Sequence, residues 1–186
     1  NALIGGQDKL TISAWVYHTE AGDHKIVCKS TDTTVANHIY SLGITCGNKL
    51  QMRIGTTDPT SGTNTSAINL DGGDIPLNEW THVAMTYDGA PSVLEKNVKS
   101  YINGQLDSEH DLTGNIRSSP DFVTIGNVHA KTGVFAEDEH FKGKLDDLGI
   151  WNVALDADHI KALAGPGNLT ATASVNDGTD LLDPSK

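Results

Sequence analysis

The sequence predicts an all-β domain, a sandwich or barrel, with one short helix near its C-terminus. Period-two alternation of apolar and other side chains dominates the 186 residues. Many short strands separated by regular turn signals are typical of sandwiches and barrels. The turn signals are Gly47-Asn48, Asp71-Gly72-Gly73, Asp88-Gly89 and Asn103-Gly104. A chain of this length with 37% hydrophobic residues suits one domain with a sizeable core.

The first predicted strand, residues 10–18 (LTISAWVYH), alternates most clearly. One of its faces carries Trp15 and Tyr17. The other face carries the apolar side chains of Leu10, Ile12, Ala14 and Val16. Apolar residues on both faces favour a strand between two packed layers. The other predicted strands are residues 24–29, 38–46, 49–55, 80–88, 98–103, 121–126 and 141–152.

The only helical pattern lies at residues 156–164, in LDADHIKALAG. Asp156 is suited to cap its N-terminus, and Gly165 is suited to close it. Ile160 and Leu163 have apolar helical spacing. From Gly165 onward the chain lacks aromatic residues and is rich in Thr, Ser, Asp and Gly, which is typical of a linker or a terminal strand.

Charge and composition exclude several classes of protein. The formal net charge of −11 disfavours nucleic acid, which is bound through Lys and Arg, and disfavours an anionic membrane surface. The sequence contains no run of 18 apolar residues, so it does not predict a membrane-spanning segment. The abrupt start at NALIGG predicts a fragment of a longer secreted or surface protein.

The two cysteines, Cys28 and Cys46, lie symmetrically about residue 37. If the flanking segments form a hairpin about that centre, the two thiols face each other at disulfide distance. Two free thiols are the alternative. Neither arrangement has the CxxC spacing of zinc or redox sites.

Motifs along residues 10–164 resemble those of bacterial laminin-G-like (concanavalin A-like) jellyroll domains, in the same order. They are LTISAWVYH, KIVCKS, IYSLGI, NKLQMRIG, LNEWTHVAMTYDG, VKSYINGQL, VTIGN and FKGKLDDLGIWNVALDADHIKAL. The resemblance implies a two-sheet antiparallel jellyroll over residues 1–165, and a linker or terminal strand over 166–186. The family usually begins with one or two strands that are cut short here, and the tail is similar to connections between modules of large calcium-dependent adhesins.

The sequence does not predict an enzyme. Glycosidases that resemble laminarinases carry three acids at alternate positions of one strand, whereas Glu137 and Glu139 form only a pair. Asp146 and Asp147 are consecutive, so on a regular strand they point to opposite faces. No serine lies in a Gly-x-Ser-x-Gly elbow.

Aromatic and histidine residues are the candidates for ligand contacts. The resemblance places the three tryptophans, Trp15, Trp80 and Trp151, in the core, while sugar stacking is the alternative. Tyr17, Tyr40 and Phe135 are expected at the surface, and Phe135 is the best candidate to stack on a ligand. His129 and His140 are candidates for a rim site, and His82 is expected to be a semi-buried structural residue.

Calcium is the expected cofactor, because it binds carboxylate, amide and carbonyl oxygens in irregular geometry. The resemblance brings three loops to one rim of the sandwich. They contribute Asn37, Asn127 and the acidic run Glu137, Asp138 and Glu139. A solvated acidic loop is the alternative.

Asp146 is a separate case. Its position in the family implies a structural acid or a second ion site.

The leading hypothesis is a non-catalytic, calcium-assisted carbohydrate-binding module of an extracellular or surface protein, used in adhesion. Its partners would be glycans or cell-surface polysaccharide, and it would be part of a multidomain chain. The alternative is a protein-interaction or spacer domain of an adhesin. Both rest on fold-level resemblance.

Overall fold

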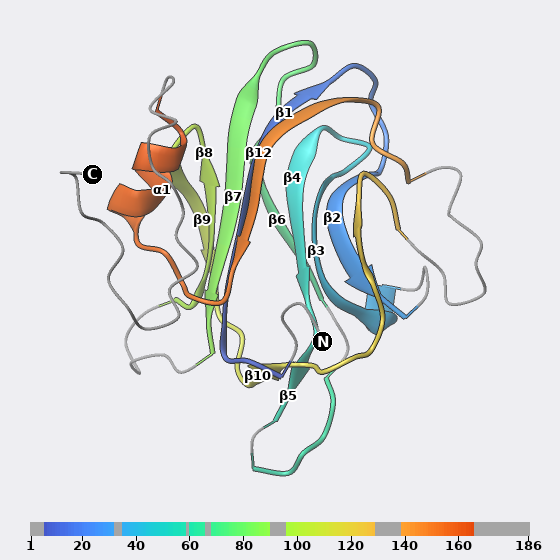
Figure 1. Ribbon diagram of the computed structural model, residues 1–186, viewed down its shortest axis with the longest axis vertical. Coiled ribbons are helices and arrows are strands. Elements are labelled where there is room, and N and C mark those ends of the chain that lie inside the picture. The colour runs from blue at the N-terminus through green and yellow to red at the C-terminus, as the bar shows by residue number, and fades with distance from the viewer. Residues whose placement is uncertain are drawn as a thin grey trace, which may run out of the picture.

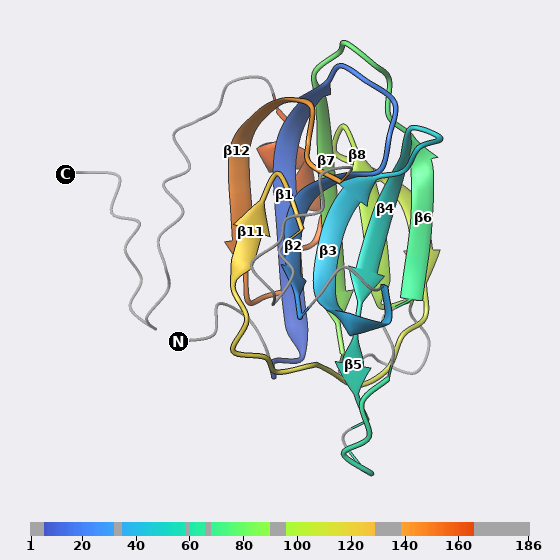
Figure 2. The ribbon, with the colours of Figure 1, turned by 90° about the vertical axis from the view of Figure 1, so that its right-hand side faces the viewer.

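The computed structural model confirms a jellyroll sandwich of two antiparallel sheets with one short helix near the C-terminus (Figure 1). It describes residues 6–31, 35–58, 60–65, 68–89, 96–128 and 139–165. The two five-stranded sheets lie face to face, one in front of the other in the view of Figure 2. We call them sheet A and sheet B.

Sheet A consists, in spatial order, of β12 (Gly143–Trp151), β1 (Lys9–His18), β7 (Thr81–Asp88), β8 (Val98–Ile102) and β9 (Gln105–His110). Sheet B consists of β11 (Val123–Ile125), β2 (His24–Ser30), β3 (His38–Ile44), β4 (Lys49–Ile54) and β6 (Ile68–Asp74). The two-residue strands β5 (Thr56–Thr57) and β10 (Asn115–Ile116) pair with each other, and the short 3-10 helix η1 (Val35–Asn37) precedes β3.

The hydrophobic core lies between the two sheets. Sheet A contributes the predicted face of β1 and the alternate residues Val83, Met85 and Tyr87 of β7. Sheet B contributes Tyr40, Leu42, Ile44, Leu50, Met52 and Ile54. Because side chains alternate along a strand, the residues between these point away from the core. We call the two faces that they form the outer face of sheet A and the outer face of sheet B.

Helix α1 (Ala157–Leu163) covers part of the outer face of sheet A (Figure 1). The predicted cap is confirmed, since the Asp156 side chain accepts a hydrogen bond from the His159 backbone N–H at 3.0 Å. Ile160 is buried and packs against Ala84 and Tyr101 of the sheet. No helix among the described residues is long and apolar enough to cross a membrane.

The sequence did not predict β6, β9 or the two-residue strands β5 and β10, and the expected turn at Asp71-Gly72-Gly73 is wrong. These residues lie inside β6. A Cβ on Gly73 would lie 2.4 Å from Oδ1 of Asp107, whose other oxygen accepts from the Gly73 N–H. The glycine therefore admits a side chain of β9 and does not reverse the chain. Strand β9 (QLDSEH) is a largely exposed edge strand, which explains its lack of apolar alternation.

The two cysteines are free thiols, which was the second of the two alternatives. The β2–β3 hairpin pairs Cys28 with Ser41, and Ser30 with His38. Its centre is therefore near residue 34 rather than residue 37. Cys46 lies beyond the end of β3 and is exposed, whereas Cys28 is buried.

Candidate functional site

The predicted rim residues Asn127 and Glu139 come close together beside β2. The Phe141 N–H donates to the Gly126 carbonyl at 2.7 Å, and the Lys25 N–H donates to the Glu139 carbonyl at 3.0 Å. The segment that begins at Glu139 thus continues the edge of sheet B where β11 ends. The segments that contain Asn127 and Glu139 therefore meet at one edge of sheet B. His140 lies at the same edge with an exposed side chain.

The carboxylate of Glu139 is occupied by a buried lysine. Lys25 Nζ lies 2.8 Å from Glu139 Oε2, and the Lys25 side chain is only 1% exposed. A buried ammonium needs a paired carboxylate, because removing either charge from water is costly. The first role of Glu139 is therefore to neutralise Lys25.

Of the other predicted calcium ligands that the structure describes, Asn127 and Asn37 do not complete a site at Glu139. The side-chain oxygen of Asn127 accepts from the Val128 N–H at 2.7 Å. Asn37 precedes β3 near Ser30, at the opposite end of β2 from Lys25, about 16 Å away along the strand. Asn37 therefore does not converge with Glu139, because the hairpin runs from one end of the sandwich to the other.

Four predicted site residues, His129, Phe135, Glu137 and Asp138, lie outside the described residues. Within the described ranges, no group of three or more His, Cys, Asp or Glu side chains could hold a metal ion. The described residues therefore do not fit a complete calcium site by themselves.

Tyr40 is fully buried in the core, so its expected surface position is wrong. In the pairing of β3 with β4, Tyr40 lies opposite Ile54, and both belong to the core. Alternation in IYSLGI is ambiguous, because both faces of this central strand are buried.

The expected core position of the three tryptophans is wrong. Trp80 is 44% exposed, and Trp15 and Trp151 are half-buried, so none of them is in the core. The side chains of Trp15 and Tyr17 lie on the outer face of sheet A, as the alternation of LTISAWVYH indicated. We call Trp15, Tyr17 and Trp80, with the flanking Lys144 and Asp146, the aromatic strip.

The geometry of the aromatic strip follows from strand pairing. Tyr17 lies opposite Lys144, and Trp15 lies opposite Asp146. The rings of Tyr17 and Trp80 are 5.7 Å apart at an interplanar angle of 55°, and Lys144 Nζ lies 5.4 Å from the Tyr17 ring centre. An open aromatic surface flanked by an ammonium and a carboxylate offers both stacking and hydrogen bonds to a ligand.

A β-bulge in β12 places a second carboxylate beside the aromatic strip. From Ser13 to Trp15, β1 advances two residues while its partners advance three, from Gly149 to Asp146. The extra residue lets Asp147 adopt a positive φ of 47°, and its N–H donates to Asp146 Oδ1 at 2.9 Å. Both carboxyl side chains are exposed, so the consecutive acids do not point to opposite faces as a regular strand requires.

Beside Trp15, on the neighbouring strand β7, lies the buried side chain of His82. The rings of Trp15 and His82 are 5.6 Å apart in an edge-to-face arrangement. His82 Nε2 is 2.9 Å from the hydroxyl of Ser13, and burial lowers the pKa of His82 to about 4. His82 is therefore neutral at physiological pH, and its predicted structural role is confirmed.

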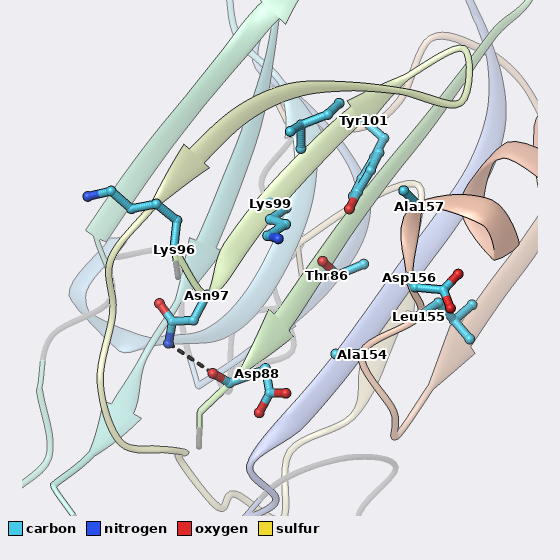
Figure 3. Close-up of a pocket in the computed structure, with 11 residues that line it drawn as sticks. Thr86, Asp88, Lys96, Asn97, Lys99, Tyr101, Ala154, Leu155, Asp156 and Ala157 are labelled. Atoms are coloured by element: carbon cyan, nitrogen blue, oxygen red, sulfur yellow. Dashed lines mark hydrogen bonds between the residues drawn. The ribbon is translucent and has the colours of Figure 1, made fainter. Parts of the chain in front are cut away.

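A second feature of the outer face of sheet A is a polar hollow of about 280 Å³ beside the start of α1 (Figure 3). Its lining comes from β7, β8 and the segment before α1, and includes Thr86, Lys99, Tyr101 and Asp156. These groups already have partners. Tyr101 hydrogen-bonds Thr86, Lys99 lies 3.5 Å from Glu109, and Asp156 caps the helix. These lining groups are therefore already paired within the protein, whereas the aromatic strip presents an exposed indole.

The buried thiol of Cys28 is poorly suited to act as a nucleophile. Burial raises the pKa of Cys28 to about 12, so the thiolate does not form at physiological pH. Its sulfur is 3.8 Å from Nδ1 of His38, in the interior of sheet B.

Comparison with known proteins agrees with this architecture. Residues 1–161 match the family model described as the concanavalin A-like lectin/glucanases superfamily. No curated protein sequence matches the chain.

Three solved structures illustrate the fold. A heptameric pentraxin from Limulus polyphemus has a TM-score of 0.58 and 21% identity, over 87% of this chain and 72% of its own. The CBM40 module of a Ruminococcus gnavus sialidase, bound to α2,3-sialyllactose, has a TM-score of 0.62 and 18% identity, covering 86% and 84%. Domain 4 of a Geobacillus stearothermophilus arabinanase, with arabinotriose, has a TM-score of 0.60 and 20% identity, covering 88% and 69%. Since the family model covers most of the sequence, the chain belongs to the concanavalin A-like lectin/glucanase superfamily.

Proposed function

We propose that this domain is a non-catalytic glycan-binding module of a secreted or surface protein, and that it binds through the aromatic strip. The observation that carries the proposal is the exposed indole of Trp80 beside Tyr17, on a sheet face flanked by Lys144 and Asp146. The apolar face of a sugar ring stacks on an exposed aromatic ring, while ammonium and carboxylate groups at its edge bind hydroxyls.

The fold supports this proposal at the level of architecture. Two of the similar structures are carbohydrate-binding domains in complex with sialyllactose and arabinotriose. At 18–20% identity they support a sandwich that accommodates sugars, but not a particular sugar. Both oligosaccharides are suitable first probes.

A glycan array followed by calorimetry on the hits tests the proposal. Trp80→Ala removes the stacking surface and is expected to weaken binding at least about tenfold, the loss that corresponds to about 1.4 kcal/mol. Ile125→Ala is the matched control, because Ile125 is an exposed apolar residue on sheet B, 61% exposed. Equal affinities of Trp80→Ala and the unaltered protein would reject the aromatic strip as the site.

Calcium assistance is a second part of the proposal and rests on the acidic sequence of residues 137–139. Thermal unfolding with excess calcium and then with chelator tests it directly. A bound ion at one hundred times its dissociation constant stabilises the native state by about 2.7 kcal/mol, a shift of several degrees. The array is repeated in both conditions, since a midpoint that is the same with calcium and chelator would leave a metal-free module.

A protein-interaction or spacer role is the alternative, and two exposed apolar residues at the edge of sheet B favour it. Phe122 is 75% and Ile125 61% exposed, beside and on the short edge strand β11. Edge strands with apolar side chains are suited to pairing with another chain. No binding on the glycan array, together with concentration-dependent association lost in Ile125→Lys, would favour this role.

A further inference from the structure

A fourth aromatic ring lies on the outer face of sheet A, in line with the aromatic strip. Trp151 is opposite Thr11 in the pairing of β12 with β1, but its indole does not stay at that position. A Cβ at Gly149 would lie 2.6 Å from Cζ2 of Trp151, so the six-membered ring of the indole lies over this glycine. Gly149 is opposite Ser13, the residue two positions before Trp15. The indole of Trp151 therefore extends the row of aromatic rings along β1.

The absence of a side chain at Gly149 makes room for this ring. A side chain at that position would occupy the space of the indole and displace it. Trp151 is half-buried, so part of its ring remains open to a ligand. Apolar rings gathered on an outer sheet face, away from the core, are typical of a binding surface.

The row of rings is longer than one sugar ring. From Ser13 to Tyr17, β1 advances about 13 Å as an extended strand. Trp15 lies between these two positions, and Trp80 adds a ring 5.7 Å from that of Tyr17. Strands β12 and β1, which carry most of the row, run side by side at one edge of sheet A (Figure 1). Such a row fits consecutive sugars of an extended chain better than a single terminal sugar.

The row ends beside Thr11. The Thr11 hydroxyl donates to the Val153 carbonyl at 2.7 Å and accepts from the Leu155 N–H at 2.9 Å. These bonds hold the segment between β12 and α1 against β1, beyond the ring of Trp151. A bound chain therefore stacks on a limited number of rings, and its affinity should stop rising above a certain length.

The charges beside the row favour a chain without charged groups. On β12, Lys144 lies opposite Tyr17 and Asp146 lies opposite Trp15. Asp147 follows Asp146, and the side chains of Lys144 and both acids are exposed. Sugar hydroxyls donate to carboxylates and accept from an ammonium, so they suit this mixture. A chain with an acid on every sugar would meet two carboxylates for one ammonium, on a protein of net charge −11.

We propose that the aromatic strip, extended by Trp151, binds several consecutive sugars of a neutral, extended polysaccharide chain. This inference rests on the proposed glycan-binding function and adds the class of glycan. Short oligosaccharides bind at Trp80 and Tyr17, where the exposed indole lies. Longer chains also reach the ring of Trp151 at the other end of the row.

The test is calorimetric titration with four neutral linear hexasaccharides, cellohexaose, mannohexaose, xylohexaose and arabinohexaose, and with acidic hexagalacturonate. The neutral hexasaccharide that binds is then followed through its shorter oligosaccharides down to the disaccharide. We expect affinity to rise at least about tenfold above that of the disaccharide and then to level off. The affinity of the neutral chain should change little with ionic strength, because salt screens interactions between charges.

Substitutions at the far end of the row separate long chains from short ones. Trp151→Ala should weaken hexasaccharide binding about tenfold and leave disaccharide binding within about twofold of the unaltered protein. Gly149→Ser keeps the indole but displaces it, so it should reproduce this pattern. Trp151→Phe keeps an aromatic ring and should retain part of the affinity for the hexasaccharide.

Leu106→Ala is the matched control. Leu106 is an exposed apolar residue, 51% exposed, on β9 at the opposite edge of the same sheet. Its loss should leave the affinities for both chain lengths unchanged. Unfolding midpoints of all variants show whether a loss of binding is a loss of folding, and Trp151→Phe and Gly149→Ser provide the test if Trp151→Ala does not fold.

Several outcomes would overturn the inference. They include equal affinities for the disaccharide and the hexasaccharide, binding of hexagalacturonate as tight as that of the neutral chain, and unchanged hexasaccharide affinity in the folded variants of Trp151 and Gly149. If Trp80→Ala loses binding of a glycan from the array while no neutral hexasaccharide binds, the inference fails and the proposed function stands. If no glycan binds the unaltered protein, both fail.

Discussion

The outer faces of the two sheets differ in how they treat polar and aromatic groups. The outer face of sheet A leaves Trp80, Lys144 and Asp146 open to solvent, beside a helix that covers another part of it. The outer face of sheet B holds Lys25 and Arg53 almost without exposure. An exposed group is weakly coupled to stability, whereas a buried charge depends on its partner. Substitutions of these exposed residues of sheet A should therefore affect binding more than folding, whereas substitutions of the buried charges of sheet B should affect folding.

The largest effect is expected from breaking the buried ion pair of sheet B. Lys25→Met leaves Glu139 without its partner and should lower the free energy of unfolding by about 3 kcal/mol. The double variant Lys25→Met/Glu139→Met should recover most of this loss, because no uncompensated charge remains. Urea unfolding of the three proteins measures both values. A single variant as stable as the unaltered protein would contradict the buried pair.

The next effect concerns the buried histidine behind the aromatic strip. Burial holds the pKa of His82 at about 4, below its ordinary value of 6.5. Between pH 6.5 and pH 4, the unfolded chain therefore binds a proton at His82 that the folded chain does not. The contribution of neutral His82 to the free energy of unfolding is fully present above pH 6.5 and is lost as the pH falls towards 4. Linkage sets the loss at about 3 kcal/mol.

Unfolding of the protein and of His82→Gln between pH 7 and pH 4 measures this contribution. Glutamine keeps a hydrogen-bonding group for Ser13 but does not titrate, so the variant should show a flatter dependence on pH. Parallel curves for the two proteins would show that His82 is not the group responsible.

A smaller effect is expected at the helix that covers sheet A. Asp156→Ala removes the cap of α1 and should cost about 1 kcal/mol. Asp156→Asn keeps a capping oxygen and should cost much less. Thermal or urea unfolding distinguishes the two, and an equal loss in both variants would mean that the charge, rather than the cap, is what matters.

The smallest effect is expected from Lys144→Ala on the aromatic strip. Its ammonium lies near the Tyr17 ring but is exposed, so its loss should change stability by only about 0.5 kcal/mol. We expect the same variant to weaken glycan binding measurably. A loss of several kcal/mol in the free energy of unfolding would contradict the small contribution to stability expected for an exposed residue of sheet A.

Local patterns were sufficient for most of the strands and for the helix. Alternation in LTISAWVYH assigned both faces of β1 correctly, and Asp156 capped α1 as predicted. The same alternation contained the signal for the aromatic strip, since it separated Trp15 and Tyr17 from the core face. The family resemblance then placed the tryptophans in the core, and this was wrong.

The sequence by itself determined the class of fold, because period-two alternation and turn residues are properties of neighbouring positions. Only the tertiary structure decided which sites form. The Lys25–Glu139 pair joins residues 114 positions apart, the Arg117 side chain lies over Gly55, and a bulge turns Asp146 and Asp147 to the solvent. Asn37 and Glu139 lie at opposite ends of β2 although their loops suggested one rim. Such contacts depend on strand register and chain path, which no local pattern of residues specifies.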